Sequence, residues 1–157
     1  MIRASALAAA VLLCCGPLLA QDESAGSPSV HYSGPAQIDI KANRREPVEF
    51  RFTIAPNFHI NSHAPRDKEL IPTRLIAIES TGIDISDVHF PEGEDYAFPF
   101  DPENKLSVYT GEFAIKAQTR TAPGEHTLQV LLHYQACDNR MCYPPRDLPF
   151  EIKLIAK

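Results

Sequence analysis

The sequence predicts an all-β fold, and more specifically an immunoglobulin-like antiparallel β-sandwich. Apolar and polar residues alternate with a period of two over several segments, which is typical of half-buried strands. The 14 prolines and 7 glycines divide the chain into short runs. Only Arg66–Leu70 has a pattern compatible with even one helical turn. Seven or eight short strands over about 120 residues fit two packed sheets.

The first 20 residues predict a secretory signal peptide. One positive charge at Arg3 precedes an apolar run from Ala4 to Cys15, and a Gly-Pro break and the small residue Ala20 follow. The run is too short to cross a bilayer, which takes about 20 apolar residues. We expect cleavage after Ala20, loss of the first two of the four cysteines, and a soluble exported protein. A lipoprotein is the alternative, but the residues before those cysteines are not of the usual small type.

The rest of the chain divides into a lead-in and one domain. Residues 21–36 are rich in Ser, Gly and Pro and predict a flexible lead-in. The domain is expected over residues 37–157, a length that suits a single core. The net charge is −5, and loss of Arg3 makes it more negative. This charge argues against nucleic acid as a partner, and it permits peripheral contact with a membrane at most.

The strands are predicted in order along the chain. The clearest alternation runs from Val48 to Ile54 and from Leu128 to Tyr134, with an apolar residue at every second position. Runs rich in β-branched and aromatic residues, bounded by Pro, Gly, Asn and Asp, predict the others. These are Gln37–Ala42, Phe58–Asn61, Thr73–Glu79, Asp84–Phe90, Leu106–Ala117 and Leu148–Ile155.

A long acidic connection, PEGEDYAFPFDPENK, is predicted from Pro91 to Lys105. Connections of this length in compact domains are usually functional lids or disordered segments. The aromatic residues Tyr96, Phe98 and Phe100 argue against disorder. Two interpretations stay open at this point: a lid over a functional site, or a loop whose rings complete the core at the end of the sandwich.

The two remaining cysteines, Cys137 and Cys142, are predicted to form a disulfide. Export would place them in a compartment where disulfides persist. A strand that ends at Tyr134 leads into the first cysteine and another strand follows the second, so residues 138–141 form the tip of a turn. The cysteines then face each other across its mouth, within the separation that a disulfide needs. Because Cys137 is in register with outward-facing Gln135, it should point away from the core if no bulge intervenes.

This disulfide is a weak staple and a good candidate for exchange chemistry. A bridge that closes six residues contributes only about 2 kcal/mol on the chain-entropy model. Attack by an incoming thiolate requires the exposure that an edge position provides. Pro144 and Pro145 hold Cys142 stiffly, while the nearby arginines and aspartates act in opposite directions on a thiolate. An inert disulfide in a non-catalytic secreted binding or assembly domain is the alternative.

A metal site is a further alternative. Soft or borderline ligands that could gather around Cu(I), provided that the cysteines are reduced, are His133, Cys137, Met141 and Cys142. His59 and His63 are four residues apart, but Pro65 and the strand pattern disfavour a helical metal-binding face. We interpret both histidines as surface-loop residues and expect neither a metal nor another cofactor.

Four segments resemble the amino-terminal periplasmic domain of the thiol:disulfide interchange protein DsbD family. They are YQACDNRMCYPP (Tyr134–Pro145), NFHINSHAP (Asn57–Pro65), LIPTRL (Leu70–Leu75) and VHFPEG (Val88–Gly93). The resemblance extends over nearly all of residues 37–157. It implies an immunoglobulin-like domain with the activity of a thiol–disulfide oxidoreductase of the protein-disulfide reductase type, located in the bacterial periplasm.

The resemblance also implies roles for individual residues. Cys142 would form the mixed disulfide with partners, and Cys137 would resolve it. Phe58 and Asn61 match positions beside the pair. A cap loop with a shielding aromatic would correspond to residues 91–105, and the candidates for the ring are Tyr96, Phe98 and Phe100. We expect Tyr143 and Pro144 to add a small docking platform for a partner.

The implied partners are a membrane or thioredoxin-like electron donor and thioredoxin-fold periplasmic acceptors such as disulfide isomerases. The chain departs from the family pattern in two respects. Its cysteines have four residues between them rather than five, and its sequence holds neither a membrane electron-transfer domain nor a thioredoxin-like domain. The donor is therefore expected to be another polypeptide, and the protein itself a monomer.

Overall fold

The structure, a computed structural model, describes residues 29–78 and 82–157. These residues form twelve strands and no helix, which confirms the predicted all-β class. The predicted signal peptide, residues 1–20, lies outside the described residues. The strands are β1 Val30–Tyr32, β2 Gln37–Ile40, β3 Glu46–Ile54, β4 His59–Asn61, β5 Arg74–Ala77, β6 Ile83–His89, β7 Glu94–Phe98, β8 Asp101–Tyr109, β9 Glu112–Thr121, β10 Gly124–Tyr134, β11 Ala136–Cys137 and β12 Arg146–Ala156.

Two four-stranded sheets enclose the core of an immunoglobulin-like β-sandwich, as predicted. One has the strand order β1-β3-β9-β6 and the other β2-β12-β10-β5. Every second residue of β9 is buried, because a strand with one face on the core alternates with a period of two. Phe150 of one sheet packs on Tyr32 and Phe50 of the other, with ring centroids 4.3 Å and 6.0 Å apart. Among the described strand pairs, β2 and β12 alone run parallel.

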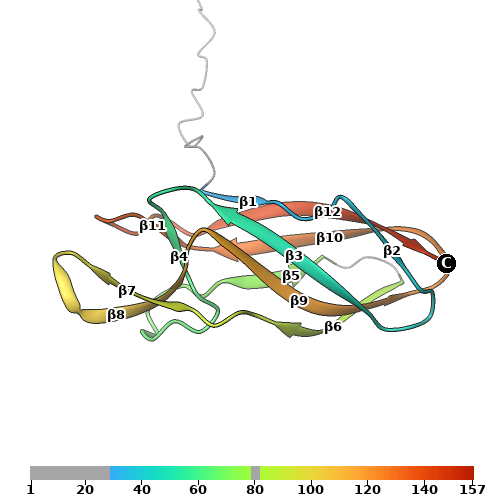
Figure 1. Cartoon of the computed structure of the whole chain (residues 1–157), viewed down its shortest axis with the longest axis horizontal. Coiled ribbons are helices and arrows are strands. Elements are labelled where there is room, and N and C mark those ends of the chain that lie inside the picture. Colours follow the sequence, from blue (N-terminus) through green and yellow to red (C-terminus); the bar gives the residue numbers. More distant parts are fainter. Residues whose placement is uncertain (1–28, 79–81) are drawn as a thin grey trace, which may run out of the picture.

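A third sheet, in the order β11-β4-β8-β7, lies at the end of the molecule opposite the C-terminus (Figure 1). It forms because the chain leaves the long β10–β12 pair after Tyr134, where the pairing with Arg146 ends. The next strand, β11, pairs with β4 instead, with Cys137 opposite His59. Strand β4 pairs in turn with β8, and β8 with β7. The third sheet therefore places both cysteines at one end of the sandwich.

The predicted domain boundary at residue 37 is wrong. Strand β1 lies inside the segment 21–36 that the sequence predicts as a flexible lead-in, and it pairs with β3 through Val30 and Ile54. Val30 is completely buried. A three-residue strand among Ser, Gly and Pro is too short to show a period of two, so composition hides it. The ordered domain begins at Val30 or before.

Three other segments differ from their predicted form. The connection predicted over residues 91–105 contains β7 and the first part of β8, which form a hairpin. The single strand predicted over Leu106–Ala117 is divided between β8 and β9 by a turn at Gly111, whose positive φ of 55° suits glycine. Arg66–Leu70, whose pattern is compatible with one helical turn, forms a simple turn instead, in which the Leu70 N–H donates to the Asp67 carbonyl at 3.3 Å.

Candidate functional site

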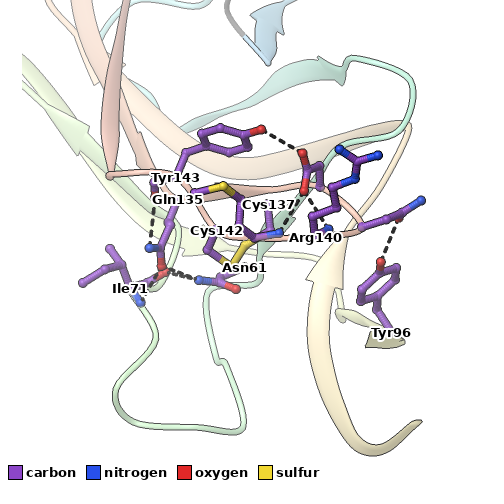
Figure 2. The surroundings of a disulfide bond; sticks show 11 residues. Asn61, Ile71, Tyr96, Gln135, Cys137, Arg140, Cys142 and Tyr143 are labelled. Carbon is purple, nitrogen blue, oxygen red and sulfur yellow. Dashed lines mark hydrogen bonds between the residues drawn. A yellow bond between two sulfur atoms is a disulfide. The ribbon is translucent and has the colours of Figure 1, made fainter. Parts of the chain in front are cut away.

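The predicted disulfide between Cys137 and Cys142 is present at the end of the third sheet (Figure 2). The Cα atoms are 3.9 Å apart, and the two residues form an antiparallel bridge. Two backbone hydrogen bonds close the turn on either side of it. The Asp138 N–H donates to the Met141 carbonyl at 3.0 Å, and the Tyr143 N–H donates to the Ala136 carbonyl at 2.8 Å. Residues 138–141 are therefore the tip of a tight hairpin, as the sequence predicts.

The two cysteines differ in exposure. Cys137 is 0% exposed, whereas Cys142 is partly exposed. The prediction that Cys137 points away from the core is wrong. That prediction assumes that the alternation of β10 continues past Gln135. The chain changes sheets there, and two consecutive residues, Ala136 and Cys137, are both buried. The part of the disulfide that solvent reaches belongs to Cys142.

The carboxylate of Asp138 holds the turn between the cysteines. Its Oδ1 accepts hydrogen bonds from the backbone N–H groups of Arg140 and Met141 at 2.7 Å and 2.9 Å. Its Oδ2 accepts one from the hydroxyl of Tyr143 at 2.7 Å. These bonds, that of Tyr143 above all, lower the pKa of Asp138, and the same contact raises the pKa of Tyr143. The ionised carboxylate thus connects both sides of Cys142.

Two amide side chains, the buried Asn61 and the half-buried Gln135, connect β4 to the exit of the turn (Figure 2). The Asn61 Nδ2 donates to Gln135 Oε1 and to the Ile71 carbonyl, both at 3.0 Å. The Gln135 Nε2 donates to the carbonyl of Tyr143 at 3.1 Å. Asn61 was predicted beside the cysteine pair, and this network places it there. Sequence reasoning missed Gln135, although the residue stands two positions before Cys137.

Of the other predicted neighbours, Phe58 and Tyr143 are half-buried and Pro144 is exposed. The rings of Phe58 and Tyr143 contact each other with centroids 6.0 Å apart. Pro144 is exposed, as is Met141, at 54%, on the tip of the turn. These apolar residues flank the accessible cysteine, as a docking platform would require, and their role stays a prediction.

Of the three aromatic residues on the β7–β8 hairpin, Tyr96 is bonded to the cysteine turn. Its hydroxyl donates to Asn139 Oδ1 at 2.9 Å. Its ring lies on that of His59, with centroids 4.0 Å apart. The ring of Phe98 is 5.9 Å from His59, and Phe100 stacks on Phe98 while 68% exposed. The hairpin therefore contacts the site through Tyr96, and Phe100 does not complete the core.

The interpretation of His59 as a surface-loop residue is wrong. The side chain is on β4, is 2% exposed and lies in register with Cys137. Burial lowers the pKa of His59, an effect that the negative charge of Asp138 partly opposes. The Nε2 atom is buried without a hydrogen-bond partner. His63, by contrast, is exposed, and its Nδ1 lies 2.8 Å from the hydroxyl of Tyr109.

The structure gives the copper hypothesis no support. The sulfur atoms of Cys137 and Cys142 are bonded to each other in the disulfide. The Nδ1 of His133 lies 2.6 Å from Asp147 Oδ1. In residues 29–78 and 82–157, no three side chains of His, Cys, Asp or Glu gather where they could hold a metal ion. The same part of the chain has no helix with the length and apolar character needed to cross a membrane.

Comparisons with known proteins place this geometry in a family. Among solved structures, the chain is similar to the reduced form of the DsbD n-terminal domain of Neisseria meningitidis, with 24% identity over 71% of this chain and 79% of that chain and a TM-score of 0.44. It is also similar to the ASH/PapD-like domain 7 of human CEP192, with 8% identity over 99% and 98% of the two chains and a TM-score of 0.40. No curated protein matches the sequence. The family model for the N-terminal part of the thiol:disulfide interchange protein DsbD matches residues 30–153, and so the chain belongs to this family.

Proposed function

We propose that the domain is a periplasmic thiol–disulfide exchange module. It passes electrons from a thioredoxin-like donor to thioredoxin-fold acceptors through Cys137 and Cys142. Family membership supports the type of chemistry. The observation that carries the assignment of roles is the unequal exposure of the two cysteines, since Cys137 is buried and Cys142 is not. A partner sulfur must lie in line with the S–S bond, and of the two cysteines only Cys142 is reached by solvent.

The transfer to an acceptor takes two exchange steps. In the dithiol form, the Cys142 thiolate attacks one sulfur of the acceptor disulfide, which breaks that bond and releases the other acceptor sulfur as a thiolate. The Cys137 thiolate then attacks Cys142, re-forms the intramolecular disulfide and expels the second acceptor sulfur. Two electrons and two protons leave the domain, and the acceptor becomes a dithiol. The same steps in reverse reload the domain from a reduced donor.

The surroundings of the pair suit this exchange. The Asp138 carboxylate and the Gln135 amide hold both ends of the turn, so that the cysteines stay adjacent when the bond between them is open. Exposed Met141 and the ring of Tyr143 offer an apolar surface beside Cys142. The β7–β8 hairpin, bonded to the turn through Tyr96 and Asn139, serves as a lid that a docking partner displaces.

Trapping of the mixed disulfide tests the proposal. We expect Cys137→Ser to accumulate a covalent adduct with a periplasmic thioredoxin-fold protein, because the sulfur that resolves the adduct is absent. Cys142→Ser should trap at least tenfold less, since its remaining sulfur is buried. The measurement is non-reducing electrophoresis of both variants expressed in the native host, followed by identification of the adducts.

Two outcomes would count against the proposal. Equal trapping by the two variants would overturn the division of roles between the cysteines. An adduct from neither variant, with both folded by circular dichroism, would favour the alternative of a non-catalytic domain with an inert bridge.

A further inference from the structure

Two buried polar atoms near the disulfide have no hydrogen-bond partner. They are the Nε2 of His59 and the Oδ1 of Asn61, which are both on β4. Buried polar atoms are nearly always paired in folded proteins, because leaving one unpaired is costly. Unpaired atoms at a reactive centre therefore point to a partner that exists in another state of the site.

Both atoms belong to side chains on the same face as Cys137. His59 is the register partner of Cys137, and opposed residues of an antiparallel pair project to the same face of the sheet. Asn61 is two residues further along β4 and contacts Gln135, which is two residues before Cys137. The four side chains thus form two adjacent rows on one face, with His59 directly opposite the buried Cys137.

The resolving step requires a proton acceptor at this place. Cys137 must lose its proton before it attacks, and a buried thiol ionises less readily than an exposed one. Burial of His59 lowers its pKa, so the imidazole is neutral at pH 7 and Nε2 can accept a proton when Nδ1 carries the hydrogen. The ring of Tyr96 from β7 lies against the imidazole, and the negative charge of Asp138 in the turn favours the imidazolium that forms.

We propose that His59 is the proton acceptor for Cys137 in the resolving step, an inference that rests on the proposed function. The proton of the Cys137 thiol moves to Nε2 of His59 as the sulfur attacks Cys142 and the bond from Cys142 to the acceptor breaks. The departing acceptor sulfur leaves as a thiolate. The imidazolium then gives the proton to that thiolate or to water. The proton lost by Cys137 is thus accounted for, and the electron pair of the broken disulfide leaves with the acceptor sulfur.

Single-turnover kinetics of the full domain with glutathione disulfide test this role. Acid quenching and mass spectrometry follow the glutathione adduct as it forms on Cys142 and as it resolves. An ordinary thiol with a pKa of about 8.5 is only about 3% ionised at pH 7, so the loss of an effective base slows resolution by about 30-fold. We expect this effect from His59→Gln, with adduct formation changed less than about twofold. The exposed neighbour provides the matched control, and His63→Gln should leave both rates unchanged.

The pH profile of the wild-type protein gives a second measurement that does not depend on the folding of a variant. If His59 is the base, the resolution rate levels off above the ordinary histidine pKa of 6.5, because the pKa of His59 lies below that value. Without a base, the rate rises about tenfold per pH unit up to the pKa of the thiol. His59→Gln should convert the first profile into the second.

The outcomes separate this inference from the proposed function. Equal resolution rates in wild type and His59→Gln, or a wild-type rate that rises through pH 8 without levelling off, overturn the role of His59 alone. A wild-type protein that forms no adduct with glutathione disulfide, or an adduct that never resolves, contradicts the proposed exchange function itself.

Discussion

Asp138 shows how one residue can fix the geometry of the turn that holds the proposed exchange site. Asp138 directly follows the buried Cys137. Its side chain accepts three hydrogen bonds, from Arg140, Met141 and Tyr143, which lie on either side of the partly exposed Cys142. A carboxylate in this role must be ionised, and the hydrogen bonds lower the pKa of Asp138 accordingly. The same negative charge disfavours a thiolate nearby. Asp138 therefore fixes the turn and moderates the reactivity of its cysteines.

The lowered pKa gives Asp138 a defined effect of pH on stability. A carboxyl whose pKa is lower in the folded state stabilises the fold above its unfolded pKa, and the effect disappears as pH falls through the folded pKa. We expect Asp138→Asn to lower the melting temperature by a few degrees at pH 7 and at pH 5. The difference from wild type should shrink below pH 3.8, the ordinary pKa of the group. Thermal melts of both proteins, followed by circular dichroism, measure this difference across the pH range. Asp147→Asn, which removes a carboxylate from β12 and not from the turn, is the control.

A constant difference between wild type and Asp138→Asn down to pH 2 would contradict this interpretation. It would mean that the ionisation of the Asp138 carboxyl does not affect the stability of the fold. The contribution of its charge would then be negligible in this exposed turn.

The β7–β8 hairpin is the element that distinguishes the site end of the molecule. It is bonded to the rest of the domain at few points near the site. These include the Tyr96 hydroxyl on Asn139, the Tyr96 ring on His59, and an ion pair between Asp95 and Arg66. The hydrogen bond and the ion pair are exposed, and exposed contacts open locally at low cost. An element that is held by a few surface contacts can protect the disulfide and still yield to a partner.

The lid interpretation predicts the effect of loosening this hairpin. Tyr96→Phe keeps the ring on His59 and removes the hydrogen bond to Asn139. A hydrogen bond of this kind contributes about 0.5–1.5 kcal/mol, so the open hairpin should become about 2- to 10-fold more populated. The rate at which dithiothreitol reduces the disulfide should rise by the same factor. Stopped-flow measurement of reduction checks it, with Phe100→Ala as a matched control because this ring is exposed and stacks on Phe98.

If Tyr96→Phe and wild type were reduced at equal rates, the hydrogen bond would not limit access to Cys142. If Phe100→Ala lowered the melting temperature strongly, the hairpin would be part of the stabilising core. Either result would require another account of its three aromatic residues.

The strands that alternate were predictable from the sequence, whereas the complete burial of β4 and the existence of β7 were not. Strands β3, β9, β10 and β12 have one face on the core, so their residues show a period of two and their approximate positions follow from it. All three residues of β4 are buried, which removes the alternation and hides the burial of His59. Strand β7 has no buried residue, and its acidic sequence looks like a loop.

At the scale of the whole molecule, the disulfide lies at one end, away from the centre of the hydrophobic core. Most of the largest buried side chains belong to the two facing sheets, whereas the disulfide lies in the third sheet at one end (Figure 1). The change of sheet after Tyr134 creates this arrangement. It also explains why the sequence predicts the pairing of the cysteines but not the burial of Cys137, since a change of sheet is a tertiary feature that local alternation does not reveal.

This separation predicts that the disulfide can be reduced without unfolding the domain. The bridge closes a loop of six residues and contributes about 2 kcal/mol, and the turn keeps the hydrogen bonds of Asp138 and Gln135 when the bond opens. Oxidised and reduced protein should both unfold cooperatively, with melting temperatures that differ by about 10 °C or less. The double variant Cys137→Ala and Cys142→Ala should melt like the reduced protein and excludes reoxidation during the scan. Loss of the cooperative transition on reduction would show that the bridge holds the fold together, and a carrier that unfolded in each cycle could not exchange electrons repeatedly.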